Sequence, residues 1–355
     1  MHLPNPMSNR EQNGLRGSVK TCVEETRYPG VTAGDGSLIP GWQSWYKTEY
    51  DIDGRFIATR SRNSDGSEWE TRYAYNEAGQ LIQTAWGNVG KPTAETVYSY
   101  NGGGRLMSIT DSRTPDNPVR FVYDERGKRT KVQVSRPGDY RPNVAVAGSP
   151  FQVADSAPNL PGGGSATTLY DDQDRPYEIQ IRDAQGELMS RAVRSYDDKG
   201  NVIEEKQILE NPETIIPAEM RAQILESSGS SLEELRAHLT NLMGGQAGPF
   251  SIVYSYNARG LVEQTTRRIF NREDRIETTY NGHGDNVTEI TRTVEIKLGT
   301  EQSMSQPGLP SYSEGRCSYQ YDNHGNWIEK IVSYRSSPGG AFESSGAFLR
   351  TLTYF

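Results

Sequence analysis

One short unit of the sequence indicates how the chain folds: Tyr75-Asn76-Glu77-Ala78-Gly79-Gln80-Leu81. An Asp or Asn at the head of a turn accepts a hydrogen bond from the backbone two residues on, and a later glycine supplies the left-handed residue. A turn of this kind makes a β-hairpin with a bulge, and the apolar residue after the glycine starts the returning strand. The unit therefore predicts a hairpin and not a catalytic loop.

The unit, Tyr-Asp/Asn-x-x-Gly-x-apolar, recurs nine times, and the first four tyrosines are 25, 25 and 23 residues apart. The copy at Tyr170 has Asp174 in the glycine position, which predicts a distorted turn, and another copy starts at Tyr280. The predicted structural turn residues in the other copies are Tyr50, Asp51, Gly54, Tyr75, Asn76, Gly79, Tyr100, Asn101, Gly104, Tyr123, Asp124, Gly127, Tyr196, Asp197, Gly200, Tyr256, Asn257, Gly260, Tyr321, Asp322 and Gly325.

Alternating tyrosines precede several of these turns, as in Tyr73 and Tyr75 or Tyr98 and Tyr100. This period of two predicts strands, and 13 of the 20 tyrosines fit a cross-strand aromatic ladder. The alternative is an exposed platform on which sugars or nucleic-acid bases stack. The repeat alone explains the tyrosines as structural residues.

Composition narrows the classes of function. The chain has 355 residues, of which 34% are hydrophobic, with 36 glycines, 19 prolines and a net charge of −8. The acidic balance without a basic stripe argues against nucleic-acid binding. The sequence contains no run of about 18 apolar residues, which predicts that the chain does not insert into a membrane, and its first residues lack the basic and apolar regions of a signal peptide. The compartment therefore stays open.

At the level of its repeat, the sequence resembles the RHS/YD-repeat family over roughly residues 45 to 334. The resemblance implies an all-β fold of tandem hairpins in an elongated, curled or partly coiled sheet. It also implies a bacterial protein that is extracellular or attached to the cell envelope. The autoproteolytic core and the toxin domain of the larger members are missing, so the chain resembles a small free-standing member.

Four regions are predicted: an N-terminal strand and loop over 1–44, repeat sheet over 45–208, a helical hairpin over 209–249, and repeat sheet over 250–355. Pro217 opens the first helix of the hairpin, and Ser231 and Glu234 form a capping box for the second. The hairpin is expected to pack on the sheet and cover an apolar patch. A partner-docking arm or a plug inside a curled shell are the alternatives.

The connections opposite the tyrosine turns vary in length and are expected to carry binding specificity. They cover 86–96, 111–118, 136–165, 209–249, 298–315 and 336–346. The function predicted from this arrangement is a non-enzymatic scaffold that binds a protein or a glycan. Two alternatives are a shell fragment of an RHS-type toxin system and a glycan-acting enzyme, which needs paired carboxylates in a cleft.

Few residues suggest catalytic or metal chemistry, so no enzyme activity, cofactor or metal is predicted. His283 and His324 occupy the same slot before the glycine in consecutive turns, which makes a metal pair conceivable, although this slot is a solvated turn position. Cys22 and Cys317 match no metal spacing. A disulfide between them requires the first and last strands to meet.

Overall fold

A long antiparallel meander makes up most of the molecule. The structure, a computed structural model, describes residues 8–32, 37–63, 65–136, 164–183, 185–216, 218–242, 250–269, 272–295 and 311–355. Each strand from β4 to β22 pairs with the next along the chain. These strands are β4 Trp42–Tyr50, β5 Phe56–Arg62, β6 Glu68–Tyr75, β7 Leu81–Asn88, β8 Lys91–Tyr100, β9 Leu106–Asp111, β10 Val119–Tyr123, β11 Arg129–Arg136, β12 Gly164–Tyr170, β13 Pro176–Arg182, β14 Leu188–Tyr196, β15 Val202–Leu209, β16 Phe250–Tyr256, β17 Val262–Ile269, β18 Arg272–Tyr280, β19 Asn286–Glu295, β20 Ser311–Tyr321, β21 Trp327–Arg335 and β22 Glu343–Tyr354.

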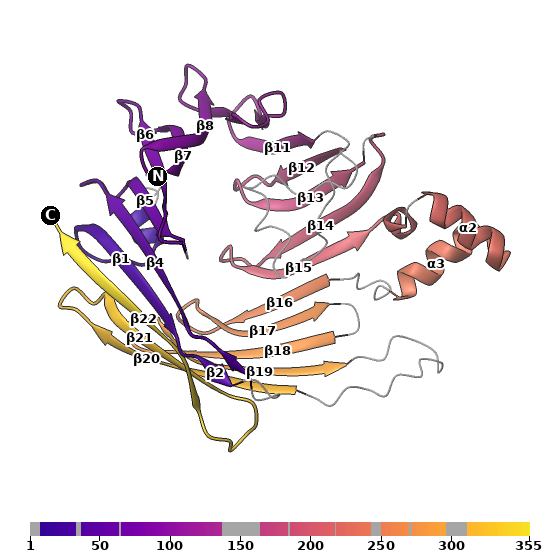
Figure 1. Cartoon of the computed structure of the whole chain (residues 1–355). Helices are drawn as coiled ribbons and strands as arrows, with labels where there is room; N and C mark the ends of the chain where they lie inside the picture. Colours follow the sequence, from indigo (N-terminus) through magenta and orange to yellow (C-terminus); the bar gives the residue numbers. More distant parts are fainter. Residues whose placement is uncertain are drawn as a thin grey trace.

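Strand β1, Val19–Tyr28, closes this meander into a ring (Figure 1). It pairs antiparallel with β22, where Cys22 faces Leu352, and antiparallel with β4, where Cys22 faces Thr48. Without β1, the 20-stranded sheet would have nineteen strands, and its first and last strands would run in the same direction. β1 therefore supplies the one strand that completes an antiparallel ring. A small separate pair, β2 Val31–Thr32 and β3 Leu38–Ile39, lies between β1 and β4 in the chain.

The predicted fold class was right about antiparallel hairpins and wrong about their arrangement. The sheet is a closed 20-stranded barrel and not an elongated, curled or partly coiled strip. The prediction followed pairings between neighbours in the chain. Closure depends on the pairing of β1 with β22, over 300 residues away, and no local pattern signals that contact.

The two faces of the sheet differ in chemistry. Side chains alternate along each strand, so Tyr46, Thr48 and Tyr50 of β4 share one face, which we call the tyrosine face. The opposite face carries Lys47 and Glu49. Ion pairs occur on both faces. Glu70 of β6 binds Arg60 and Arg72 on the face opposite the tyrosines, while Asp274 of β18 binds Arg267 and Arg272 on the tyrosine face.

The turns at the tyrosine rim share one hydrogen-bond pattern. In the turn after Tyr75, the N–H of Asn76 donates to the Gln80 carbonyl and the N–H of Gly79 donates to the Asn76 carbonyl, each at 2.9 Å. The Asn76 side-chain oxygen accepts the Gln80 N–H at 2.9 Å. The same two backbone bonds close the turns headed by Asp51, Asn101, Asp124, Asp171, Asp197, Asn257, Asn281 and Asp322.

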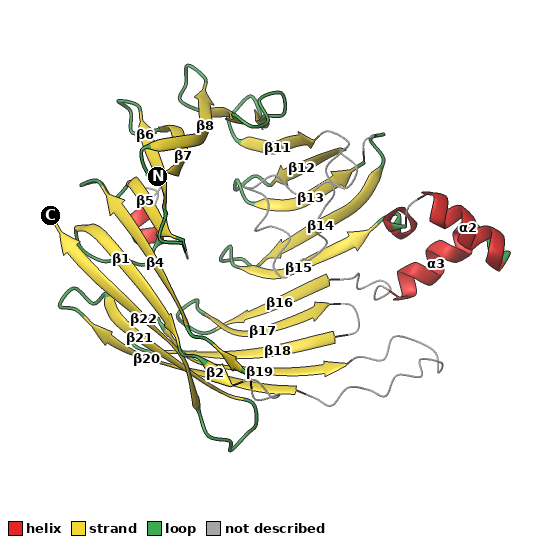
Figure 2. Cartoon of the chain, in the orientation of Figure 1, coloured by secondary structure: helices red, strands yellow, loops and turns green. Residues whose placement is uncertain are grey.

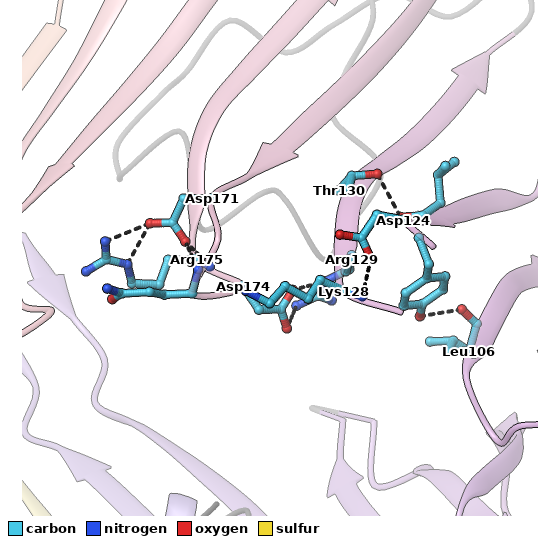
Figure 3. Close-up of polar contacts among 11 residues, drawn as sticks. Leu106, Asp124, Lys128, Arg129, Thr130, Asp171, Asp174 and Arg175 are labelled. Atoms are coloured by element: carbon cyan, nitrogen blue, oxygen red, sulfur yellow. Dashed lines mark hydrogen bonds and ion pairs between the residues drawn. The ribbon is translucent and has the colours of Figure 1, made fainter. Parts of the chain in front are cut away.

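Asp174 keeps its turn regular, contrary to the expected distortion. Its φ is 58°, in the left-handed region, and its N–H donates to the Asp171 carbonyl at 3.0 Å as a glycine does elsewhere. Arg129 of the neighbouring hairpin lies against the Asp174 carboxylate at 3.1 Å (Figure 3). A short carboxylate side chain tolerates this conformation, and the arginine anchors it.

The turn tyrosines have a role that their alternation does not reveal. The Tyr123 hydroxyl donates to the Leu106 carbonyl at 2.7 Å, where the preceding hairpin begins its returning strand (Figure 3). Each such bond ties one hairpin to the one before it. Equivalent bonds join Tyr100 to Leu81, Tyr196 to Pro176, Tyr256 to Val202 and Tyr280 to Val262.

The glycine at the end of each turn is expected to be costly to replace. Gly104 has a φ of +76°, in the left-handed region. Gly102 in the same turn lies outside that region and has open space where a Cβ would be placed. Gly104→Ala should lower the free energy of unfolding by about 1–2 kcal/mol, and Gly102→Ala should leave it nearly unchanged. Urea unfolding of both variants is the measurement. Equal stability of the two would contradict the left-handed turn.

The helices lie apart from the sheet. η2 Pro212–Ile215, α2 Ala218–Ser228 and α3 Leu232–Leu242 project from the ring beyond β15 and β16 (Figure 2). Ser231 and Glu234 form the reciprocal capping bonds, and Glu213 of η2 binds Arg236 of α3. The expectation that this hairpin covers an apolar patch of the sheet was wrong. None of the helices in the described ranges is long and apolar enough to cross a membrane.

The edge of the sheet opposite the tyrosine rim differs from the sequence prediction in two ways. Most of the predicted variable connection at 86–96 is strand, because β7 and β8 meet in a tight turn at Val89 and Gly90. The same edge also holds turns built like those of the tyrosine rim, headed by Asn63 and Asp183 without a tyrosine before them. Most of the predicted connections at 136–165 and 298–315 lies outside the described residues.

Candidate binding site at the barrel seam

The N-terminal residues 8–18, here called the strap, run across the rim next to β1. α1, Asn9–Gln12, begins with a capping box between Ser8 and Glu11. The N–H of Arg10 donates to the Gly54 carbonyl at 3.0 Å. At the other end of the strap, Arg16 donates to the Gly325 carbonyl at 2.8 Å. The strap thus joins the first and last of the predicted turns on either side of β1.

Beneath the strap, a pocket of about 260 Å³ opens on the tyrosine face. It lies at the seam, which we define as strands β22, β1 and β4, and extends onto β5 and β6. The pocket combines aromatic rings, hydroxyl groups and one ion pair. Its lining residues are Asn13, Leu15, Cys22, Glu24, Tyr46, Thr48, Phe56, Thr59, Tyr73 and Arg350.

One ion pair fixes the electrostatics of this seam pocket. Arg350 of β22 donates from Nε to the Glu24 carboxylate of β1 at 2.9 Å, and its guanidinium lies 3.6 Å from the ring centroid of Trp327. The arginine side chain is 12% exposed and the glutamate side chain 37% exposed. Glu24 can therefore accept hydrogen bonds from a ligand while Arg350 stays held from both sides.

Cys22 and Tyr73 of the pocket, and Tyr50 beside it, are neutral near pH 7 because their pKa values are raised. Burial, helped by the nearby Glu24 carboxylate, raises the pKa of the Cys22 thiol to about 12. Burial also raises the pKa of Tyr50 to about 12, against the effect of the hydrogen bond that its hydroxyl accepts from Asn13 at 2.8 Å. The Tyr73 pKa is raised by burial as well. Such groups donate and accept hydrogen bonds and are poor nucleophiles or bases.

This arrangement suits binding better than catalysis. Glu24 is the one carboxylate among the pocket-lining residues described above, whereas glycoside hydrolysis uses a pair. Within the described ranges, the structure brings together no group of three or more His, Cys, Asp or Glu side chains able to hold a metal ion. Aromatic rings beside hydroxyls and a held ion pair fit a small polar ligand with a ring.

Sequence reasoning placed the turn residues but missed the pocket. Among the predicted turn residues, Tyr50 packs inside the seam, where it joins the buried cluster of Leu15, Val19 and Cys22. The other predicted turn residues are distributed along the rim. No motif marks Glu24 or Arg350, which pair across 326 positions of sequence. Leu15, an apolar residue shortly before β1, belongs to the buried cluster, but a single apolar residue does not predict a pocket.

The cysteines and histidines lie in separate places. Cys22 is in β1 and Cys317 in β20, with β22 and β21 between them, and both thiols are free. Closure of the sheet does not bring them together. The His283 ring stacks on the Tyr321 ring with centroids 4.2 Å apart, and the His324 ring stacks on the Tyr354 ring with centroids 4.3 Å apart. Each histidine packs against the tyrosine of the following strand or hairpin, in keeping with a structural role.

The comparisons with known proteins bear on the fold only loosely. No family model and no curated protein matches the chain. Among solved structures, a porin-like protein from Bacteroides uniformis has a TM-score of 0.35 at 10% identity over 94% of this chain and 98% of its own. A porin-like protein from Bacteroides vulgatus has a TM-score of 0.17 at 13% identity over 96% of this chain and 99% of its own. Both scores are low, so neither neighbour's function carries over.

Two sequence predictions are corrected here. The assignment to the RHS/YD-repeat family is wrong: no family model matches the chain, and the sheet closes into a 20-stranded barrel where the resemblance implied an elongated, curled or partly coiled strip. The extracellular or envelope location inferred from that resemblance loses its basis. The exclusion of membrane insertion is also wrong, because it considered only apolar helices, whereas the strands form a closed antiparallel sheet, the other kind of structure that can span a membrane.

Proposed function

We propose that this chain is a non-enzymatic barrel that binds a glycan, with one sugar ring held in the seam pocket. The main support for this proposal is the mixture of side chains that line the pocket. Tyr46 and Tyr73 offer ring faces, Thr48 and Thr59 offer hydroxyls, and Glu24 offers a carboxylate already held by Arg350. Sugars present apolar C–H faces and a dense set of hydroxyls, which these two kinds of group match.

The pocket's size supports a single ring. Its volume of about 260 Å³ is below the range of about 300–1,000 Å³ common for drug-sized ligands. A small pocket with an open side suits one unit of a longer chain. Cys22 and Glu24 on the closing strand β1 line the pocket and the strap residues Asn13 and Leu15 form one wall, so the site depends on barrel closure.

Tyr46→Ala should weaken glycan binding at least about tenfold, since loss of about 1.4 kcal/mol of contact energy is a factor of ten in Kd. Tyr46 is 41% exposed, so its loss should leave the fold intact. Tyr177, 38% exposed on β13, gives a matched control, and Tyr177→Ala should bind like the parent protein. A glycan array followed by calorimetry on both variants measures this. Absence of glycan binding, or equal binding by the two variants, would refute the proposal.

A further inference from the structure

Two glycines inside strands make room for aromatic rings on the tyrosine face, one on β22 at the seam and one on β20 beside it. A Cβ placed on Gly315 of β20 would lie 2.7 Å from Cε1 of Tyr334, and one on Gly346 of β22 would lie 3.2 Å from Cδ1 of Tyr28. Neither glycine has a φ in the left-handed region, so the turn chemistry does not require them. Their missing side chains let the two tyrosine rings approach the backbone of the neighbouring strand.

These rings remain open to solvent. Tyr334 is 46% exposed and Trp42 is 55% exposed. Trp42 stacks on Tyr28 with ring centroids 4.3 Å apart, and Phe348 meets Tyr28 edge-on at 6.1 Å. The residues Tyr28, Trp42, Tyr334 and Phe348 form what we call the aromatic platform. At this exposure the rings of Trp42 and Tyr334 add little to a core and can each offer a face to a ligand, whereas Tyr28 and Phe348 are half-buried and support them.

The platform continues the seam pocket along the strands. Glu24 of β1 faces Tyr46 of β4 at the pocket, and four residues further along β1 Tyr28 faces Trp42. Four residues of strand span about 13 Å. Between them Thr26 faces Ser44, two small hydroxyl side chains that leave the path open. Pocket and platform therefore lie in line on one face.

We infer that the seam binds an extended, β-linked pyranose chain, with one sugar in the pocket and the following sugars over the aromatic platform. This inference rests on the proposed function and goes further by naming an oligosaccharide as the ligand. A β-linked chain of pyranose chairs is extended and presents apolar C–H faces in a row, which fits a straight row of aromatic side chains. The hydroxyls of Thr26 and Ser44 lie where the sugar between the two parts would pass.

The test compares chain lengths. Titrations of the whole protein use glucose and N-acetylglucosamine and the β-1,4-linked oligomers of each, up to six units. For at least one series, affinity should rise at least tenfold from the monosaccharide to the longer oligomers. Trp42→Ala should remove most of that gain and leave monosaccharide affinity unchanged. Trp45→Ala, on the same strand but the opposite face, should change neither affinity.

The outcomes separate the two claims. Binding that does not depend on oligomer length, or a Trp42→Ala variant that keeps the full gain with length, would overturn the oligosaccharide inference and leave the pocket proposal standing. Absence of binding by every sugar in both series would overturn both claims. Circular dichroism of each variant, compared with the parent protein, shows that any loss of binding comes from the site and not from unfolding.

Discussion

A chain that lacks residues 1–28 is expected to lose its cooperative fold. The deletion removes β1, whose residues pair with β22 on one side and β4 on the other. It also removes Leu15, Val19 and Cys22 from the buried cluster around Tyr50. Two strand edges are then exposed, and exposed edges pair with other chains. Thermal unfolding followed by circular dichroism should show a broad transition at a lower temperature than in the parent protein. Light scattering should show species larger than the monomer.

A synthetic peptide of residues 8–28 provides the matched control for this deletion. Added in excess, it should restore a sharp unfolding transition and the monomeric mass. The same peptide with Val23→Pro should fail, because proline cannot donate a ladder hydrogen bond in the middle of a sheet. An unfolding midpoint in the truncated chain equal to that of the parent protein would show that β1 does not close the sheet.

Removal of the arginine beside Glu205 is expected to destabilise the barrel strongly. Glu205 on β15 is 2% exposed, and Arg194 of β14 donates from Nε to its Oε1 at 2.8 Å. Its other oxygen, Oε2, is buried and has no hydrogen-bond partner within the described part of the chain. Arg194→Leu leaves this carboxylate buried without its ion pair, which should lower the free energy of unfolding by about 3–5 kcal/mol.

Two further variants separate charge burial from lost packing. Arg194→Leu combined with Glu205→Leu should recover much of the stability, since a buried pair replaced by apolar residues is often neutral. Arg72→Leu, at an arginine with a 64% exposed side chain on the buried Glu70, should cost less than Arg194→Leu, because Arg60 still binds that carboxylate. A double variant as unstable as Arg194→Leu alone would mean that the charge is not the cause.

Local chemistry made the hairpins predictable. A tyrosine, an Asx residue and a glycine at fixed spacing are enough to predict where a strand ends and the next one starts, because the turn closes within five residues. Asn63 and Asp183 head similar turns without a tyrosine, and the repeat pattern missed them for that reason. The tyrosine hydroxyl bond between hairpins was also missed, since it depends on the position of the neighbouring strand.

Closure and the site could not be predicted in the same way. β1 has no repeat signature. It pairs with β22 and β4 because these are the last and first strands of the meander, which depends on how many strands the meander contains. The seam pocket exists only once these three strands meet. Gly315 and Gly346 lie inside strands without a turn requirement and are a sequence signal for the aromatic platform, because a strand glycine marks close approach by another group.

Disulfide trapping across the seam tests barrel closure most directly. Thr21 of β1 faces Thr353 of β22, with 2.6 Å between their hydroxyl oxygens. Cysteines at both positions should form an intramolecular disulfide under mild oxidation, as should a control pair at Thr279 and Thr288, which face each other within the meander. Peptide mapping of the monomer is expected to find both bridges. If the control bridge forms and the Thr21–Thr353 bridge does not, the sheet is open and the account is wrong.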